Sequence, residues 1–164
     1  MAINLKDIPE AVKAYLNTQV TVTITPFVPV GNSVQPNETF TFDVTVKNNG
    51  DVALKNVKYK VWAVNPGIAK VRTPTNGSST DLEGNSIGGD QEVGGFIFNP
   101  SNNSVYDLPA GDHDALHLTG KAVSGPSGGT TGIRASVFAD IDLDLLFPKG
   151  EDSGTSQRTL TVQG

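Results

Sequence analysis

The two histidines of the chain, His113 and His117, lie four residues apart in the segment DHDALH. Side chains at this spacing share one face of a β-strand, and Asp112 and Asp114 flank the first histidine. Imidazole and carboxylate groups are ordinary zinc ligands, so a metal site is one interpretation of the segment. The other is a solvent-exposed start of a strand. We favour the second interpretation and predict no metal here.

Alternating aspartates at Asp140, Asp142 and Asp144 form a second candidate, and Glu151 and Asp152 follow closely in the sequence. Calcium prefers several carboxylate and carbonyl oxygens around one ion. On a regular strand the three aspartates would spread over roughly 13 Å, and no glycine interrupts the run to form a loop around an ion. We predict an electrostatic role for them, and calcium binding stays open as the alternative.

Neither catalysis nor nucleotide binding is indicated by a motif. A Ser-His-Asp triad can be drawn from the many serines and aspartates, but no nucleophile turn between a strand and a helix supports it. The segment GGTTG at 128–132 lacks the Gly-Lys-Ser/Thr ending of a phosphate-binding loop and precedes a predicted strand. We therefore predict a non-enzymatic protein without a cofactor.

The segment DIPEAVKAYLN at 7–17 predicts a short helix. Asp7 suits the N-cap, Pro9 suits the first turn, and Glu10 favours the positive end of the helix dipole. One apolar stripe follows the helical spacing and consists of Ile8, Val12, Tyr15 and Leu16. This stripe either packs on the end of the domain or serves as a docking arm for a partner.

Beyond residue 19 the apolar period changes to two, which is typical of strands. The stretch NETFTFDVTVKNNGDVALKNVKYKVW at 37–62 alternates, turns at Asn48–Asp51, and alternates again. Leu54 is out of phase with Val57, so we expect a bulge near Asn56. The polar stretch 74–95 predicts a long loop, and further strands are expected at 96–98, 115–123, 133–145 and 159–162.

These strands and turn signals predict an all-β fold, an immunoglobulin-like antiparallel β-sandwich of about seven strands with a short N-terminal helix. We assign residues 1–18 to a helical arm and residues 19–164 to the sandwich domain. The 164 residues carry a net charge of −5, which argues against a general nucleic-acid binder. Cysteines are absent, so disulfides are excluded, and no apolar run reaches the length of a membrane span or a signal peptide.

Two segments carry a family resemblance. VQPNETFTFDVTVKNNGDVALKNVKYKVW at 34–62 resembles CARDB-like and related immunoglobulin-like domains of prokaryotic surface proteins, with a proline turn, a strand ending in Val-x-Asn, and an Asn-Val step opening the next strand. DLPAGDHDALHLTGKAV at 107–123 resembles the later Leu-Pro-x-Gly turn of the same domains. The resemblance implies the sandwich fold. Such domains recur in adhesins, enzyme accessory modules and virion proteins, so it implies no single function.

The chain starts with Met-Ala and a predicted helix, and this N-terminus has no apolar h-region and no cleavage site. Either the protein works without Sec export or a signal has been removed, and the Met-Ala start favours the first interpretation. In this respect it is similar to structural or decoration proteins of bacterial virions. We therefore predict a virion-surface protein that assembles in the cytoplasm and binds a capsid or other assembly surface. The alternative is an adhesion or carbohydrate-binding module of a prokaryotic cell-surface protein, for which the single tryptophan offers a thin aromatic platform. Self-association into a homo-oligomer is left open.

Contacts with a partner are expected through the N-terminal arm or an outer sheet. In the predicted sandwich the strand at 57–64 pairs with the strand at 133–145. Lys58 and Lys60 would then meet the three alternating aspartates in an exposed charge ladder, beside an outward apolar patch. The candidate interface residues are Ile8, Val12, Tyr15, Leu16, Trp62 and Phe138.

Overall fold

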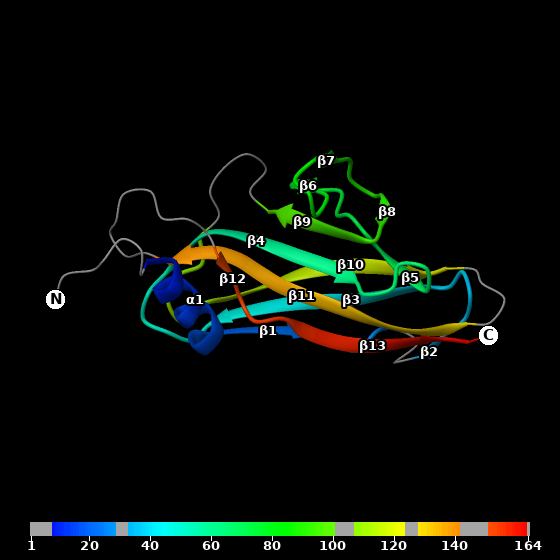
Figure 1. Ribbon diagram of the computed structural model, residues 1–164, viewed down its shortest axis with the longest axis horizontal. Helices are drawn as coiled ribbons and strands as arrows, with labels where there is room; N and C mark the ends of the chain where they lie inside the picture. Colours follow the sequence, from blue (N-terminus) through cyan, green and yellow to red (C-terminus); the bar gives the residue numbers. More distant parts are fainter. Residues whose placement is uncertain (1–7, 29–32, 101–106, 124–127, 142–150, 164) are drawn as a thin grey trace.

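The computed structural model describes residues 8–28, 33–100, 107–123, 128–141 and 151–163, which form two packed β-sheets with a helix at one end (Figure 1). The helix is α1 (Ile8–Gln19). The longer strands are β1 (Val20–Ile24), β3 (Thr39–Asn48), β4 (Leu54–Ala63), β9 (Gly95–Asn99), β10 (His113–Ala122), β11 (Gly129–Ile141) and β13 (Ser156–Val162). The shorter strands are β2 (Ser33–Val34), β5 (Ala69–Arg72), β6 (Ser78–Thr80), β7 (Ser86–Ile87), β8 (Glu92–Val93) and β12 (Glu151–Asp152).

One sheet has the strand order β1-β3-β10-β5-β8, and the other has the order β2-β13-β11-β4-β9-β6-β7 with β12 added to β11. The pairings between described strands are antiparallel except for β2 with β13, which is parallel. The predicted immunoglobulin-like sandwich with a short helix is confirmed. Seven of the described strands have five residues or more, in line with the predicted number.

The stretch predicted as one long loop at 74–95 is wrong in part, because it contains β6, β7 and β8. β6 adds to the edge of β9, β7 pairs with β6, and β8 pairs with β5. Each of these strands has only two or three residues. Such short strands show no clear alternation in the sequence, so periodicity does not reveal them.

The central pair of the larger sheet is β4 with β11, as the sequence predicts for 57–64 and 133–145. Phe138 lies opposite Lys58, but Asp140 lies opposite Lys55, so the register shifts between the two pairs. Asn56 sits at this shift with a positive φ of 54°. The predicted bulge near Asn56 is confirmed, and it lets Leu54 and Val57 both face the core.

The core consists of the inward residues of both sheets, and it follows the alternation of the strands. In β3 the pattern alternates almost perfectly, with Phe40, Phe42, Val44 and Val46 buried. Phe27, which follows β1, packs edge-on against Phe40 and Phe42 with ring centroids 5.1 and 5.6 Å away. Burial of each such ring contributes on the order of 1.5–3 kcal/mol.

α1 covers one end of the sandwich and contacts β1, β11 and β12. Val12 and Leu16 are completely buried in the shared core. The Tyr15 hydroxyl lies 2.8 Å from the Val52 carbonyl oxygen and accepts the Val52 N–H at 3.1 Å. A Cβ at Gly50 would overlap this hydroxyl, so the absence of a side chain there makes room for the tether. No helix in the described ranges is long and apolar enough to cross a membrane.

Candidate functional site

The histidine segment does not assemble a metal site in the described residues. His113 and His117 share the exposed outer face of the smaller sheet, as their spacing predicts. His117 Nδ1 lies 2.6 Å from Asp43 Oδ1 on the neighbouring strand. Asp112 accepts the backbone N–H of His113 at 2.8 Å, whereas Asp114 points inward and accepts the Tyr59 hydroxyl at 2.8 Å. The side chains of Asp112, Asp114 and His117 therefore serve different contacts, and the described residues contain no cluster of three metal-ligating groups.

The predicted charge ladder is wrong for Asp140. This side chain is only 5 % exposed, and its Oδ1 has no hydrogen-bond partner. Burial raises the pKa of the Asp140 carboxyl, and the nearby charge of Glu151 raises that pKa further. The reason for the burial is that α1 and β12 both lie against this end of β11. Lys55, opposite Asp140, contacts Asp107 at 3.1 Å.

The remaining residues of the predicted charge ladder have two other outcomes. Asp142 and Asp144 lie outside the described residues. On the outer face of the larger sheet, Lys60 Nζ lies 3.9 Å from an Asp152 oxygen, so a cross-strand ion pair exists with a different acid. The Asp152 side chain is 47 % exposed, and a pair this accessible to water contributes roughly 0–1 kcal/mol.

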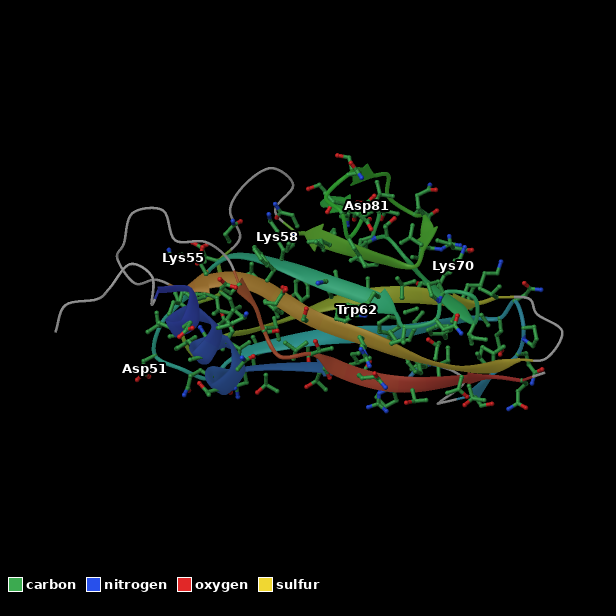
Figure 2. All side chains as sticks on the ribbon, in the orientation of Figure 1. Asp51, Lys55, Lys58, Trp62, Lys70 and Asp81 are labelled. Carbon is green, nitrogen blue, oxygen red and sulfur yellow. The ribbon has the colours of Figure 1, made fainter. Side chains whose placement is uncertain are left out.

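Trp62 and Phe138 lie on the same outer face but do not share one patch. Trp62 is opposite Arg134 and Phe138 is opposite Lys58, so the pair of Lys60 with Ser136 separates them. Lys60 Nζ is 5.4 Å from the centroid of the Trp62 ring. Lys55, Lys58 and Trp62 follow one another along β4 (Figure 2).

Trp62 contributes instead to a shallow hollow of about 290 Å³. It lies over Gly95, where a Cβ would come within 2.7 Å of the Trp62 Cβ. The exposed side chains Val64 and Leu82 border the same hollow. This hollow gives Trp62 apolar neighbours that the sequence did not identify.

The apolar stripe of α1 lies mainly inside the protein. Because Val12 and Leu16 are buried in its core, neither is available to a partner while α1 is in place. Tyr15 is half-buried and hydrogen-bonded. The Ile8 side chain lies outside the described part. This arrangement agrees with the packing alternative, and a further contact of the helix with a partner stays a prediction.

A site that the sequence did not predict lies along β10. β3 pairs with nearly the whole strand, but β5 pairs only with Thr119–Ala122. Within the described ranges, no strand lies against His113–Leu118 on the β5 side. β5 ends at Arg72, and Thr73 bonds on the β8 side, where its N–H donates to the Gln91 carbonyl at 2.9 Å. Half of β10 is therefore an open edge.

The pairing fixes which backbone groups face this edge. Alternate residues of an antiparallel strand direct both N–H and C=O to the same neighbour. Asn48 N–H donates to the Asp112 carbonyl at 2.9 Å, so the even-numbered residues of β10 bond to β3. Val123 N–H donates to the Ile68 carbonyl at 2.9 Å, so the odd-numbered residues face the β5 side. The residues that direct their backbone groups to the open edge are His113, Ala115 and His117.

An open cavity of about 460 Å³ follows this edge between the two sheets. Leu116 and Leu118 line it from β10, and Phe98 lines it from β9. Pro74 and Pro100 add further apolar surface. The cavity therefore combines apolar walls with a row of backbone hydrogen-bonding groups.

The charged rim of the cavity is already paired. Arg72 donates to Asp90 at 2.9 Å and to Glu92 at 2.7 Å. The hydrogen bonds to Asp90 and then Glu92 raise the pKa of the Arg72 guanidinium. With both acids bound, this cation helps to fix the end of β5 and carries no unpaired charge at the rim. Two features of the sequence indicate part of this site: a strand predicted from residue 115, and a long polar stretch directly after residue 73.

No protein-family model matches the chain, and no curated protein matches it in sequence. Solved structures do match it. AvmM, which catalyses macrocyclization in alchivemycin A biosynthesis, is 16 % identical with a TM-score of 0.53, and the match covers 90 % of each chain. A cohesin module from a Clostridium perfringens family 33 glycoside hydrolase is 16 % identical with a TM-score of 0.50, covering 89 % of this chain and 98 % of the module.

A CARDB domain from Pyrococcus furiosus, solved in complex with di-metal ions, is also 16 % identical and covers 88 % of this chain and 92 % of the domain. Its TM-score of 0.44 is too low to carry an argument. The structural neighbours thus include immunoglobulin-like β-sandwich domains of the CARDB and cohesin types. At these identities the likeness shows the fold alone, and none of the three is described as a virion protein.

Proposed function

We propose that the protein is a non-enzymatic protein-interaction module that binds an extended segment of a partner along the open half of β10. One observation carries the proposal. Within the described residues, no strand pairs with His113–Leu118 on the β5 side, which borders the cavity. Strand addition to a sheet edge is a recurring mode of peptide recognition, in which backbone hydrogen bonds supply affinity and pockets for alternate side chains supply specificity.

The open edge has only one of the usual protections against strand addition. Natural proteins block exposed edges with proline, lysine, bulges, very short strands or inward-pointing charges, and Asp114 is such a charge. The residues that face this edge are His113, Ala115 and His117, none of which is proline or lysine. β10 itself is ten residues long and regularly paired with β3. Such an edge is a suitable template for an added strand of about 20 Å.

We propose a virion surface or similar assembly as the setting, on the basis of the resemblance to structural or decoration proteins of bacterial virions. A cell-surface adhesion role is the second setting, and the Trp62 hollow is the feature that favours it. Both settings use the protein as a binding module, so the same experiment tests the shared claim.

Two substitutions at one residue test the edge directly. Proline at an edge position removes the outward N–H without removing a bond to the inner neighbour. Ala115→Pro therefore blocks the open edge, and Ala115→Ser keeps the N–H as the matched control. Peptides selected from a random twelve-residue library on the wild-type protein are expected to bind Ala115→Ser but to lose binding to Ala115→Pro. Equal binding to both variants, with the proline variant still folded by circular dichroism, would place the interaction elsewhere.

A further inference from the structure

The open edge of β10 also indicates which side chains an added strand should carry. Resting on the proposed function, we infer that the bound segment places an apolar side chain opposite Leu116 and a basic side chain opposite Asp114. The inference follows from the two residues of the open stretch that point to the inner side of the sheet: Leu116, which lines the cavity, and Asp114, which accepts the Tyr59 hydroxyl.

The apolar requirement comes from Leu116. This side chain is partly exposed and lines the cavity. Leu118 and Phe98 also line the cavity, but they are buried, with only 4 % and 3 % of their surface exposed. Paired residues of adjacent strands stand side by side on the same face. A residue opposite Leu116 therefore enters the cavity and covers the apolar surface that the sandwich leaves open.

The basic requirement comes from Asp114. Its carboxylate is half-buried and accepts the Tyr59 hydroxyl at 2.8 Å. A carboxylate has capacity for further donors, and within the described ranges no ion pair joins Asp114 to a cation. Arg72, a cation that lines the cavity, is held by Asp90 and Glu92. A lysine or arginine on the added strand supplies the missing positive charge.

The direction of the strand fixes the order of the two residues. β5 runs antiparallel to β10, and we infer the same direction for the added strand, because antiparallel pairing is slightly more stable per residue than parallel pairing. In an antiparallel partner the residue opposite Leu116 precedes the residue opposite Asp114 by two positions. The recognised pattern is thus an apolar residue followed two positions later by a basic residue, with both side chains on one face and about 7 Å apart.

Two blocked peptides of equal composition separate this pattern from its reverse. The first is Thr-Ser-Thr-Val-Thr-Lys-Thr-Ser, and the second exchanges Val and Lys. Each is titrated into the 15N-labelled full chain, with the Ala115 and His117 amide resonances as reporters. The first peptide is expected to bind up to about fivefold more tightly, as an exposed ion pair allows. Asp114→Asn should abolish the preference, while Asp112→Asn, at a neighbouring exposed acid that accepts the His113 N–H, should preserve it.

The outcomes distinguish the two levels of the proposal. If both peptides shift the edge amides equally, the edge binds strands but the side-chain pattern is wrong. If neither peptide shifts the edge amide resonances, and library-selected peptides bind Ala115→Pro as tightly as the wild type, the proposed function fails as well. If the free protein is a dimer and Ala115→Pro dissociates it, the edge binds a second copy of the chain. That result would overturn both the proposed function and the side-chain pattern.

Discussion

Replacing the buried Asp140 carboxylate by an amide is expected to stabilise the protein at neutral pH. The Asp140 side chain is 5 % exposed, its Oδ1 has no hydrogen-bond partner, and Glu151 adds a like charge nearby. An unsatisfied buried acceptor costs about 1–3 kcal/mol. Asparagine removes the charge and offers an N–H donor in the same volume, so we expect a gain of about 1 kcal/mol. For a chain of this size the melting temperature should rise by about 2–4 °C.

The effect should depend on pH with a defined sign. Burial and then the Glu151 charge raise the folded-state pKa of Asp140 above its ordinary value of 3.8, so the folded protein binds this proton more tightly than the unfolded chain. The protonated carboxyl therefore contributes stability that is complete below the ordinary pKa and is lost as pH rises through the raised pKa. The advantage of Asp140→Asn over the wild type should be smallest near about pH 4 and should grow with pH.

Thermal unfolding followed by circular dichroism, from about pH 4 to about pH 8 with chelator present, measures this difference. Asp107→Asn is the control, because Asp107 is 39 % exposed and forms an exposed pair with Lys55. It should change the melting temperature little and without the same trend. A loss of stability in Asp140→Asn at neutral pH would refute the reasoning. If the wild-type melting temperature also rises when calcium replaces the chelator, the carboxylate is a cation ligand.

Three further predictions concern the helix and the outer face. Leu16→Ala should lower the free energy of unfolding by about 2–5 kcal/mol in urea titrations, because Leu16 is completely buried; a loss below about 1 kcal/mol would mean that α1 is not part of the core. Gly50→Ala should destabilise the protein because its Cβ overlaps the Tyr15 hydroxyl, and combining it with Tyr15→Phe should recover part of the loss; strict additivity of the two would contradict this cause. Lys60→Ala should cost no more than about 1 kcal/mol, with a smaller effect at high salt, since its partner Asp152 is exposed; a larger, salt-independent loss would contradict an exposed ion pair.

Sequence periodicity predicted the sandwich because its long strands bury one face each. The alternation in Phe40–Val46 and the phase change between Leu54 and Val57 were sufficient to predict β3, β4 and the bulge at Asn56. The charge ladder failed for Asp140 because alternation predicts which side of a strand a residue faces, but not what later covers that side. Here α1, which is distant in sequence, and β12, which has only two residues, cover the end of β11.

The open edge of β10 was not predictable for a related reason. An edge exists where a neighbouring strand stops, so it depends on where β5 ends relative to β10 and not on the sequence of β10 alone. Beyond Arg72 the chain bonds to the β8 side, where Thr73 contacts Gln91, a residue eighteen positions later. Pairing registers, not local patterns, therefore determine where the protein can accept a strand.

Amide hydrogen exchange at Ala115 and His117 tests the central claim most directly. In the free protein both N–H groups should exchange rapidly, in contrast to the even-numbered neighbours Leu116 and Leu118, which are bonded to β3. Addition of a library-selected peptide should slow exchange at both odd-numbered positions and leave the even-numbered ones unchanged. Slow exchange at Ala115 and His117 in the free monomer would show that the edge is already occupied, and would contradict the account.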